Sequence, residues 1–100
     1  MYIKSGKILW GGVEQFEWDE AKYRRNVEKH GLGFELVERF DWSSAKIAVD
    51  DRYDYGEVRG LAYGRIDGRG YAIVFTHRGS RIRIISLRPM HERELRKHGL

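Results

Sequence analysis

The chain has 100 residues, of which 41% are hydrophobic, 34% charged and 13% aromatic, with one proline and no cysteine. This length allows one domain with one modest core, and the lack of cysteine excludes disulfides, thiol nucleophiles and Cys-ligated metal centres. The net charge is +4; residues 1–50 hold eight Lys or Arg against nine Asp or Glu, and residues 51–100 hold eleven against six. No apolar run is long enough to span a membrane and no signal peptide opens the chain, so we expect a cytoplasmic protein without membrane contacts.

The first fifteen residues differ from the rest in pattern. Residues 1–15 are expected to be an extension to a single domain that spans residues 16–100. Their glycines are compatible with a small hairpin around Ser5-Gly6, or with a loosely held segment that ends at Gly11-Gly12. The alternation of polar and apolar residues from Gln15 to Trp18 then predicts a short strand.

A helix is predicted from Glu20 to His30. Asp19 is suited to cap its start, and Gly31 to end it in the left-handed conformation. Lys29 and His30 lie in the last turn, where cations favour the helix dipole. The apolar stripe is expected to hold Tyr23, Val27 and His30, and the adjacent polar stripe Lys22, Asn26 and Lys29.

A second helix is predicted from about Gly33 to Phe40, with Phe34, Leu36, Val37 and Phe40 on its buried face. The period then changes from 3.6 to 2, which predicts strands over residues 45–49, 57–66, 70–77 and 80–87. Asp67-Gly68 is typical of a type I′ hairpin turn, and a tighter turn is expected at Arg78-Gly79. The fold class is therefore α+β, with a mainly antiparallel meander. Pro89 should end the last strand before a short helix over residues 90–98.

The last predicted strand admits two interpretations. Its alternation breaks at Ile84-Ile85. A β-bulge there would bring Arg81, Arg83, Ser86 and Arg88 onto one face, whereas a regular strand buried on both faces explains the same residues.

Arginine dominates the basic half of the chain. Seven arginines and no lysine lie between Arg59 and Arg88, with Asp67 as the only acid. The planar guanidinium matches phosphate oxygens, so this cluster favours phosphate or nucleic acid as ligand, although a solvated sheet face explains it as well. No metal or cofactor site is expected, because the spacing of His91, Glu94 and His98 is common on charged helices.

The remaining polar set suits the cleavage of RNA by its own 2′-hydroxyl. That reaction needs a base, a proton donor and positive charge near the phosphate, but no metal and no enzyme nucleophile. The candidate groups are Lys22, Lys29, His30, Tyr63, Thr76, Arg83 and Arg88. A non-catalytic module that binds nucleic acid or an acidic protein through its basic sheet is the alternative, with Tyr53, Tyr55, Tyr63 and Tyr71 available to stack on bases.

Two separated blocks resemble the BrnT family of bacterial type II toxins. The first is Phe16-Glu17-Trp18-Asp19-Glu20-Ala21-Lys22 with Asn26, Lys29-His30-Gly31-Leu32 and Phe34. The second is Arg83-Ile84-Ile85-Ser86-Leu87-Arg88-Pro89 with Arg93-Glu94. Met90 and His98, at the two ends of the predicted C-terminal helix, depart from the family pattern, which usually has a small residue and a tyrosine at these positions.

The resemblance implies a RelE-like fold and a ribonuclease toxin that inhibits translation. It also implies a BrnA-like antitoxin with a ribbon-helix-helix segment, a heterotetramer of two toxins and two antitoxins, and contact with operator DNA only through the antitoxin. By the same resemblance and the charge pattern, the catalytic residues are expected to be Lys29, His30, Tyr63, Arg83, Arg88 and Glu94. The RNA-binding residues are expected to be Lys22, Arg59, Arg81 and Ser86, and Asp19 also belongs to the matching positions.

Overall fold

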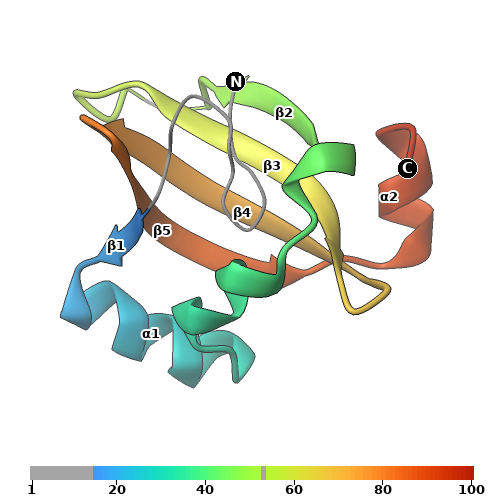
Figure 1. Cartoon of the computed structure of the whole chain (residues 1–100), viewed down its shortest axis with the longest axis horizontal. Helices are drawn as coiled ribbons and strands as arrows, with labels where there is room; N and C mark the ends of the chain where they lie inside the picture. Colours follow the sequence, from blue (N-terminus) through green and yellow to red (C-terminus); the bar gives the residue numbers. More distant parts are fainter. Residues whose placement is uncertain (1–14, 53) are drawn as a thin grey trace.

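A single sheet with the strand order β1-β5-β4-β3-β2 organises the protein (Figure 1). The computed structural model describes residues 15–52 and 54–100, so the predictions for residues 1–14 and for Tyr53 lie outside the described residues. The strands are β1 (Gln15–Trp18), β2 (Lys46–Asp50), β3 (Arg59–Ile66), β4 (Arg69–Arg78) and β5 (Arg81–Pro89); the helices are α1 (Glu20–His30) and α2 (Glu92–Lys97), with 3-10 helices η2 (Phe34–Arg39) and η3 (Trp42–Ser44). The α+β fold class is thus confirmed. No helix in these described ranges is long and apolar enough to cross a membrane.

The predicted meander is present, and the apolar strand β4 is central in it. β2, β3, β4 and β5 pair antiparallel, and β1 adds to the outer edge of β5 in parallel. Asp67 and Gly68 connect β3 to β4 with φ angles of 51° and 84°, which agrees with the predicted type I′ turn. The next turn consists of Gly79 and Ser80, one residue later than predicted.

Helix α1 begins and ends where the sequence predicts. The Asp19 carboxylate accepts a hydrogen bond from the Lys22 N–H at 3.2 Å, and Gly31 has a φ of 71°. The predicted stripes, however, are wrong in one respect: Val27 is 41% exposed, whereas Asn26, predicted on the polar stripe, is buried. The amide of Asn26 is buried because it pairs with backbone groups of β5, beyond the end of β1.

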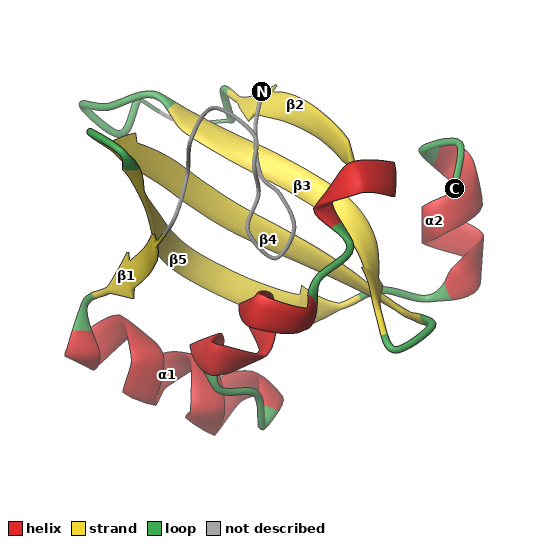
Figure 2. Ribbon diagram, in the orientation of Figure 1, coloured by secondary structure: helices red, strands yellow, loops and turns green. Residues whose placement is uncertain are grey.

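The core lies on the face of the sheet that η2 and η3 cover (Figure 2). The predicted second helix is a 3-10 helix, which is shorter than predicted. Its core residues Phe34, Val37 and the following Phe40 are three residues apart, and three residues per turn place all of them against the sheet. The 3-10 turn η3 was not predicted; it brings Trp42 into the same core.

The β-bulge at the break in alternation is confirmed. Ile84 pairs with Phe75 and Ser86 pairs with Val74, so Ile85 is the extra residue. Ile82, Ile84 and Leu87 are all fully buried in the core as a result. Ser86 and Arg88 consequently face the opposite side of the sheet.

The C-terminal segment differs from the prediction at both ends. β5 continues through Pro89, which pairs with Tyr71, and α2 is shorter than the predicted 90–98. Met90 is buried beside Leu95 instead of starting the helix. Leu95 packs closely over Gly70, where a Cβ would lie 2.3 Å from its Cδ1. The glycine therefore allows α2 to dock on the face of the sheet opposite the main core.

Candidate functional site

A trough of about 420 Å³ lies on the sheet face opposite the main core. Its floor consists of Leu61, Tyr63, Ala72, Val74, Ile85 and Ser86, which lie between residues of the main core along β3, β4 and β5. The residues with basic side chains around this floor are Lys22, Arg25, Lys29 and His30 of α1, Arg52 of the loop after β2, and Arg88 of β5. We call this site the basic trough.

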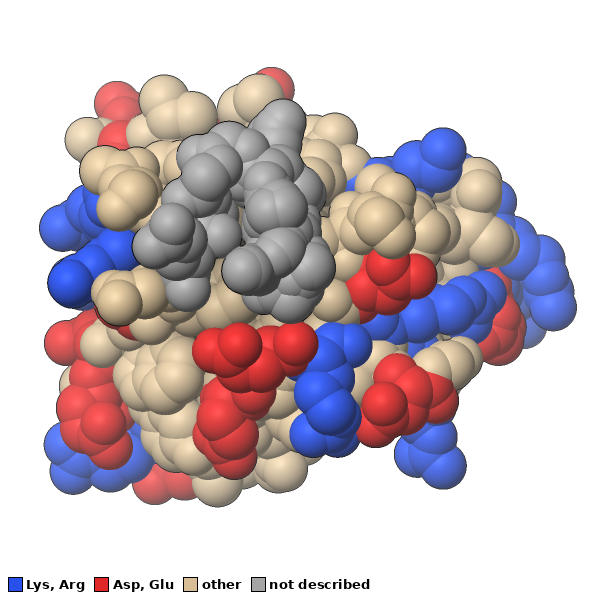
Figure 3. Space-filling view, in the orientation of Figure 1, with Lys and Arg blue, Asp and Glu red and all other residues tan. Residues whose placement is uncertain are grey.

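The basic trough is strongly one-sided in charge. Among the described residues, its lining includes five Lys or Arg and one His, and no Asp or Glu. On the face seen in Figure 3, by contrast, basic and acidic side chains are mixed. Because the fold places cations around one concavity without acids in its lining, the trough suits an anionic ligand such as RNA.

His30 is a titratable group of the trough whose pKa lies below its ordinary value. The side chain is half-buried at the C-terminal end of α1. Burial lowers the pKa of His30, and the positive charges of Lys29 and Arg88 lower it further. The imidazole is therefore neutral at pH 7, which is the form that accepts a proton.

Arg88 and Glu94 are adjacent but have different positions. Arg88 lines the trough, and its Nη2 lies 3.5 Å from the Oε2 of Glu94. Glu94 does not line the trough: its Oε1 accepts the His91 N–H, and this bond chiefly lowers its pKa. Glu94 therefore holds Arg88 from the side of α2.

Tyr63 lies on the floor of the trough, where its ring stacks on His98. Their centroids are 3.9 Å apart, with an angle of 10° between the ring planes. His98, one of the two departures from the family pattern, thus contacts the site through an aromatic stack. Lys22 and Ser86 also line the trough, so six of the ten predicted site residues meet there.

Arg81 and Arg83 lie outside the trough, near the start of β5. Both contact Glu17 of β1: Arg83 Nε donates to Oε2 at 2.9 Å and Arg81 Nη1 to Oε1 at 3.3 Å. Burial alone would raise the pKa of Glu17, but these two hydrogen bonds lower it. The structure therefore places both arginines in a surface cluster that pairs β1 with β5, apart from Lys29, His30 and Arg88.

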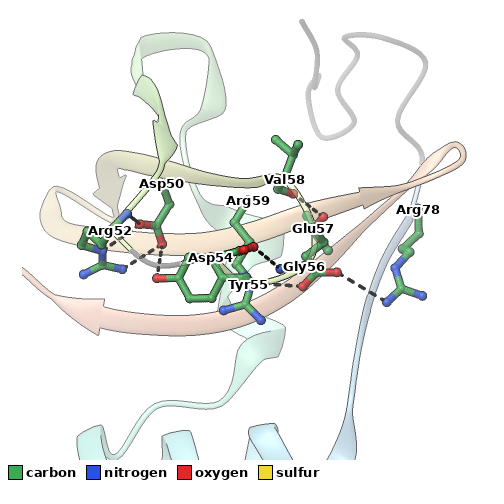
Figure 4. A network of polar contacts seen from close by, with 10 residues as sticks. Asp50, Arg52, Asp54, Tyr55, Gly56, Glu57, Val58, Arg59 and Arg78 are labelled. Carbon is green, nitrogen blue, oxygen red and sulfur yellow. Dashed lines mark hydrogen bonds and ion pairs between the residues drawn. The ribbon is translucent and has the colours of Figure 1, made fainter.

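Arg59 also lies outside the trough. Its guanidinium is 3.9 Å above the centre of the Tyr55 ring, and its Nε donates to Glu57 at 3.0 Å (Figure 4). It borders a second, mostly apolar cavity of about 510 Å³ beside β2. Tyr71, another predicted base-stacking residue, packs against the core instead.

Comparison with known proteins decides the family. The model of the family described as "Ribonuclease toxin, BrnT, of type II toxin-antitoxin system" matches residues 18–94. The chain belongs to the BrnT family. The crystal structure of the Brucella abortus ribonuclease toxin BrnT is similar, with a TM-score of 0.61 and 32% identity, over 78% of this chain and 97% of that one. No curated protein matches significantly.

Three polar residues that line the trough in this BrnT-family chain were not predicted as site residues: Arg25, Asn26 and Arg52. Arg25 and Asn26 share a helix stripe with Lys22 and Lys29, so helical spacing alone would have found them. Arg52 follows β2 in a loop, and no local pattern relates it to α1. Only the pairing of the strands brings it to the same concavity.

Proposed function

We propose that this BrnT-family protein is a metal-independent endoribonuclease that inhibits translation in the cytoplasm by cleaving RNA. The observation that carries the proposal is the basic trough, where a half-buried neutral His30 lies among cations and no carboxylate lines the walls in the described residues. Carboxylates are the usual protein ligands of Mg²⁺. The lining thus supports cleavage in which cations of the protein, rather than a metal ion, neutralise the phosphate.

In this mechanism the RNA supplies its own nucleophile. His30 accepts the proton of the 2′-hydroxyl as the 2′-oxygen bonds to phosphorus, and Lys29 donates a proton to the 5′-oxygen as its bond to phosphorus breaks. Arg88 and Ser86 bind the phosphate oxygens and stabilise the charge of the phosphorane. The products are a 2′,3′-cyclic phosphate and a 5′-hydroxyl end.

The other predicted residues act around this centre. Tyr63 contacts a base or ribose from the floor, Lys22 binds a neighbouring phosphate, and Glu94 positions Arg88. Arg59 and Arg81 bind RNA that continues beyond the trough. Arg83 remains a predicted catalytic residue, although its side chain pairs with Glu17, and its test is whether Arg83→Ala abolishes growth arrest in a folded protein.

Toxins of type II systems are neutralised by a protein antitoxin. For this chain we propose a BrnA-like antitoxin with a ribbon-helix-helix segment, in a complex of two toxins and two antitoxins that reaches operator DNA only through the antitoxin. The charge of the trough supports an acidic antitoxin segment as the inhibitor, because it would compete with RNA for the same cations.

The test is cleavage of RNA by the purified protein in excess chelator. We expect cleavage with cyclic phosphate ends, and a loss of about 10²–10⁴-fold in rate for His30→Ala. Arg39→Ala is the control, because Arg39 pairs with Asp67 and does not line the trough. Cleavage that requires added Mg²⁺ would refute metal independence. Salt-sensitive binding of RNA that stays intact would favour the non-catalytic module instead.

A further inference from the structure

Arg52 faces the basic trough from the side opposite α1. It follows β2, which is separated from β5 by β3 and β4, whereas α1 packs beside β5. With strands about 4.8 Å apart, β2 and β5 are separated by about 14 Å. The apolar side chains of Leu61 and Val74 lie on the floor between these two cationic walls.

A buried carboxylate fixes the direction of Arg52. Asp50 is only 4% exposed, and its oxygens accept Arg52 Nε at 2.8 Å, Arg52 Nη2 at 2.9 Å and the Tyr55 hydroxyl at 3.1 Å (Figure 4). The hydrogen bonds from Arg52 lower the pKa of Asp50 to about 2, so the carboxylate is charged at neutral pH. A charge is costly to bury unless it is paired, and here the pair orients one guanidinium.

The guanidinium retains donors for a ligand. Its side chain is 59% exposed, and within the described part of the chain Nη1 makes no hydrogen bond to a protein acceptor. An arginine held by one carboxylate edge still presents N–H groups on the other edge, in a geometry that matches a phosphate.

We propose that Arg52 binds a second phosphate of the RNA, one that neighbours the phosphate bound by Arg88 in the same RNA strand. This inference rests on the proposed function. The nucleoside between the two phosphates would then lie over the apolar floor, where Leu61 and Val74 provide uncharged contact. The trough thus binds a single-stranded segment that crosses the sheet from α1 toward β2.

The experiment measures the affinity of the full chain for a short 2′-O-methyl RNA, which cannot be cleaved. We expect Arg52→Ala to weaken binding about tenfold at low salt and to reduce the slope of log K against log salt by about one. Arg39→Ala is a close control, because Arg39 is 56% exposed and also pairs with an aspartate, but outside the trough. It should change neither quantity.

Neutral methylphosphonate linkages, introduced one at a time, identify the phosphate. At one linkage that flanks the scissile position, we expect the neutral linkage and Arg52→Ala each to weaken binding, with no further loss when they are combined. Additive losses at every linkage, or unchanged affinity and salt slope in Arg52→Ala, would overturn the assignment and leave the Asp50 pair as a purely structural contact.

A second variant guards against misfolding. Arg52→Ala leaves Asp50 buried without its main partner, whereas the double variant Asp50→Asn/Arg52→Gln removes both charges together. It should show the same loss of affinity with a cooperative thermal transition. Because the probe is not cleaved, these measurements do not depend on catalysis. Cleavage of ordinary RNA in the same preparation tests the proposed function separately.

Discussion

Asn26→Ala tests how α1 is attached to the sheet. The Asn26 amide donates to the Leu87 carbonyl at 2.9 Å and to the Leu32 carbonyl at 3.0 Å, and its Oδ1 accepts the Leu87 N–H at 3.1 Å. The side chain thus pairs with β5 much as a neighbouring strand would, where β1 has ended. Alanine removes all three bonds and leaves the buried groups of Leu87 without these partners.

The expected loss of stability follows from these three bonds. Each of the three hydrogen bonds contributes about 1 kcal/mol, and the buried groups left unpaired add a further cost. The higher helix propensity of alanine returns up to about 0.6 kcal/mol. The free energy of unfolding of the variant should therefore fall by about 3 kcal/mol. For a domain of this size that corresponds to a decrease in Tm of about 12–24 °C. Thermal unfolding followed by circular dichroism measures it.

Two further variants make the test specific. Asn26→Asp keeps the acceptor for the Leu87 N–H but loses both donors, so it should be destabilised as well. Arg24→Ala changes an exposed residue of the same helix and should alter Tm by little. A decrease below about 3 °C in Asn26→Ala would refute the view that this side chain anchors α1.

Three other predictions concern charge and packing. Because burial, Lys29 and Arg88 lower the pKa of His30, the acidic limb of the pH profile of kcat/KM should lie below pH 6.5; a limb at or above pH 6.5 would contradict the assignment of His30 as base. The pKa of Asp50 falls from 3.8 to about 2, so the pair with Arg52 stabilises the fold above about pH 4, and this stabilisation is lost as the pH falls toward 2. With allowance for the exposure of Arg52, Asp50→Asn should cost about 1–2 kcal/mol at pH 7 and less at pH 2, as measured by urea unfolding. Gly70→Ala should loosen the docking of α2, because the new Cβ would collide with Leu95. Backbone hydrogen exchange should then be faster in α2 but unchanged in α1. Equal protection of α2 in the variant and the parent protein would refute this contact.

The local elements of this protein follow from its sequence because their causes are local. Asp19 and Gly31 mark the ends of α1 through bonds within a few residues, and Asp67-Gly68 determines the β3–β4 turn through its own backbone angles. The first block that resembles the BrnT family includes α1, the second lies in β5 and α2, and the family model confirms the resemblance. The antiparallel meander followed from short turns between apolar strands.

Other features depended on contacts between distant residues. Periodicity alone left the bulge at Ile85 undecided, because a regular strand buried on both faces would have the same sequence pattern. The pairing of Ser86 with Val74 shows that the bulge is present. Asn26 looks like a surface residue until β5 places the backbone of Leu87 beside it. Arg83 and Arg88 look equivalent in the sequence, but Glu17 of β1 contacts only the first.

The sequence by itself therefore determined the family, the order of elements and most of the cations available to a phosphate. The tertiary structure decided which of these cations share one concavity, and it added Arg52 from a loop beyond β2. The physical reason is the distance along the chain over which each interaction acts. Helix caps, turns and the alternation of a strand depend on residues that are near one another in the sequence. A binding site depends on the pairing and bulging of strands, which bring together side chains that are far apart in the chain.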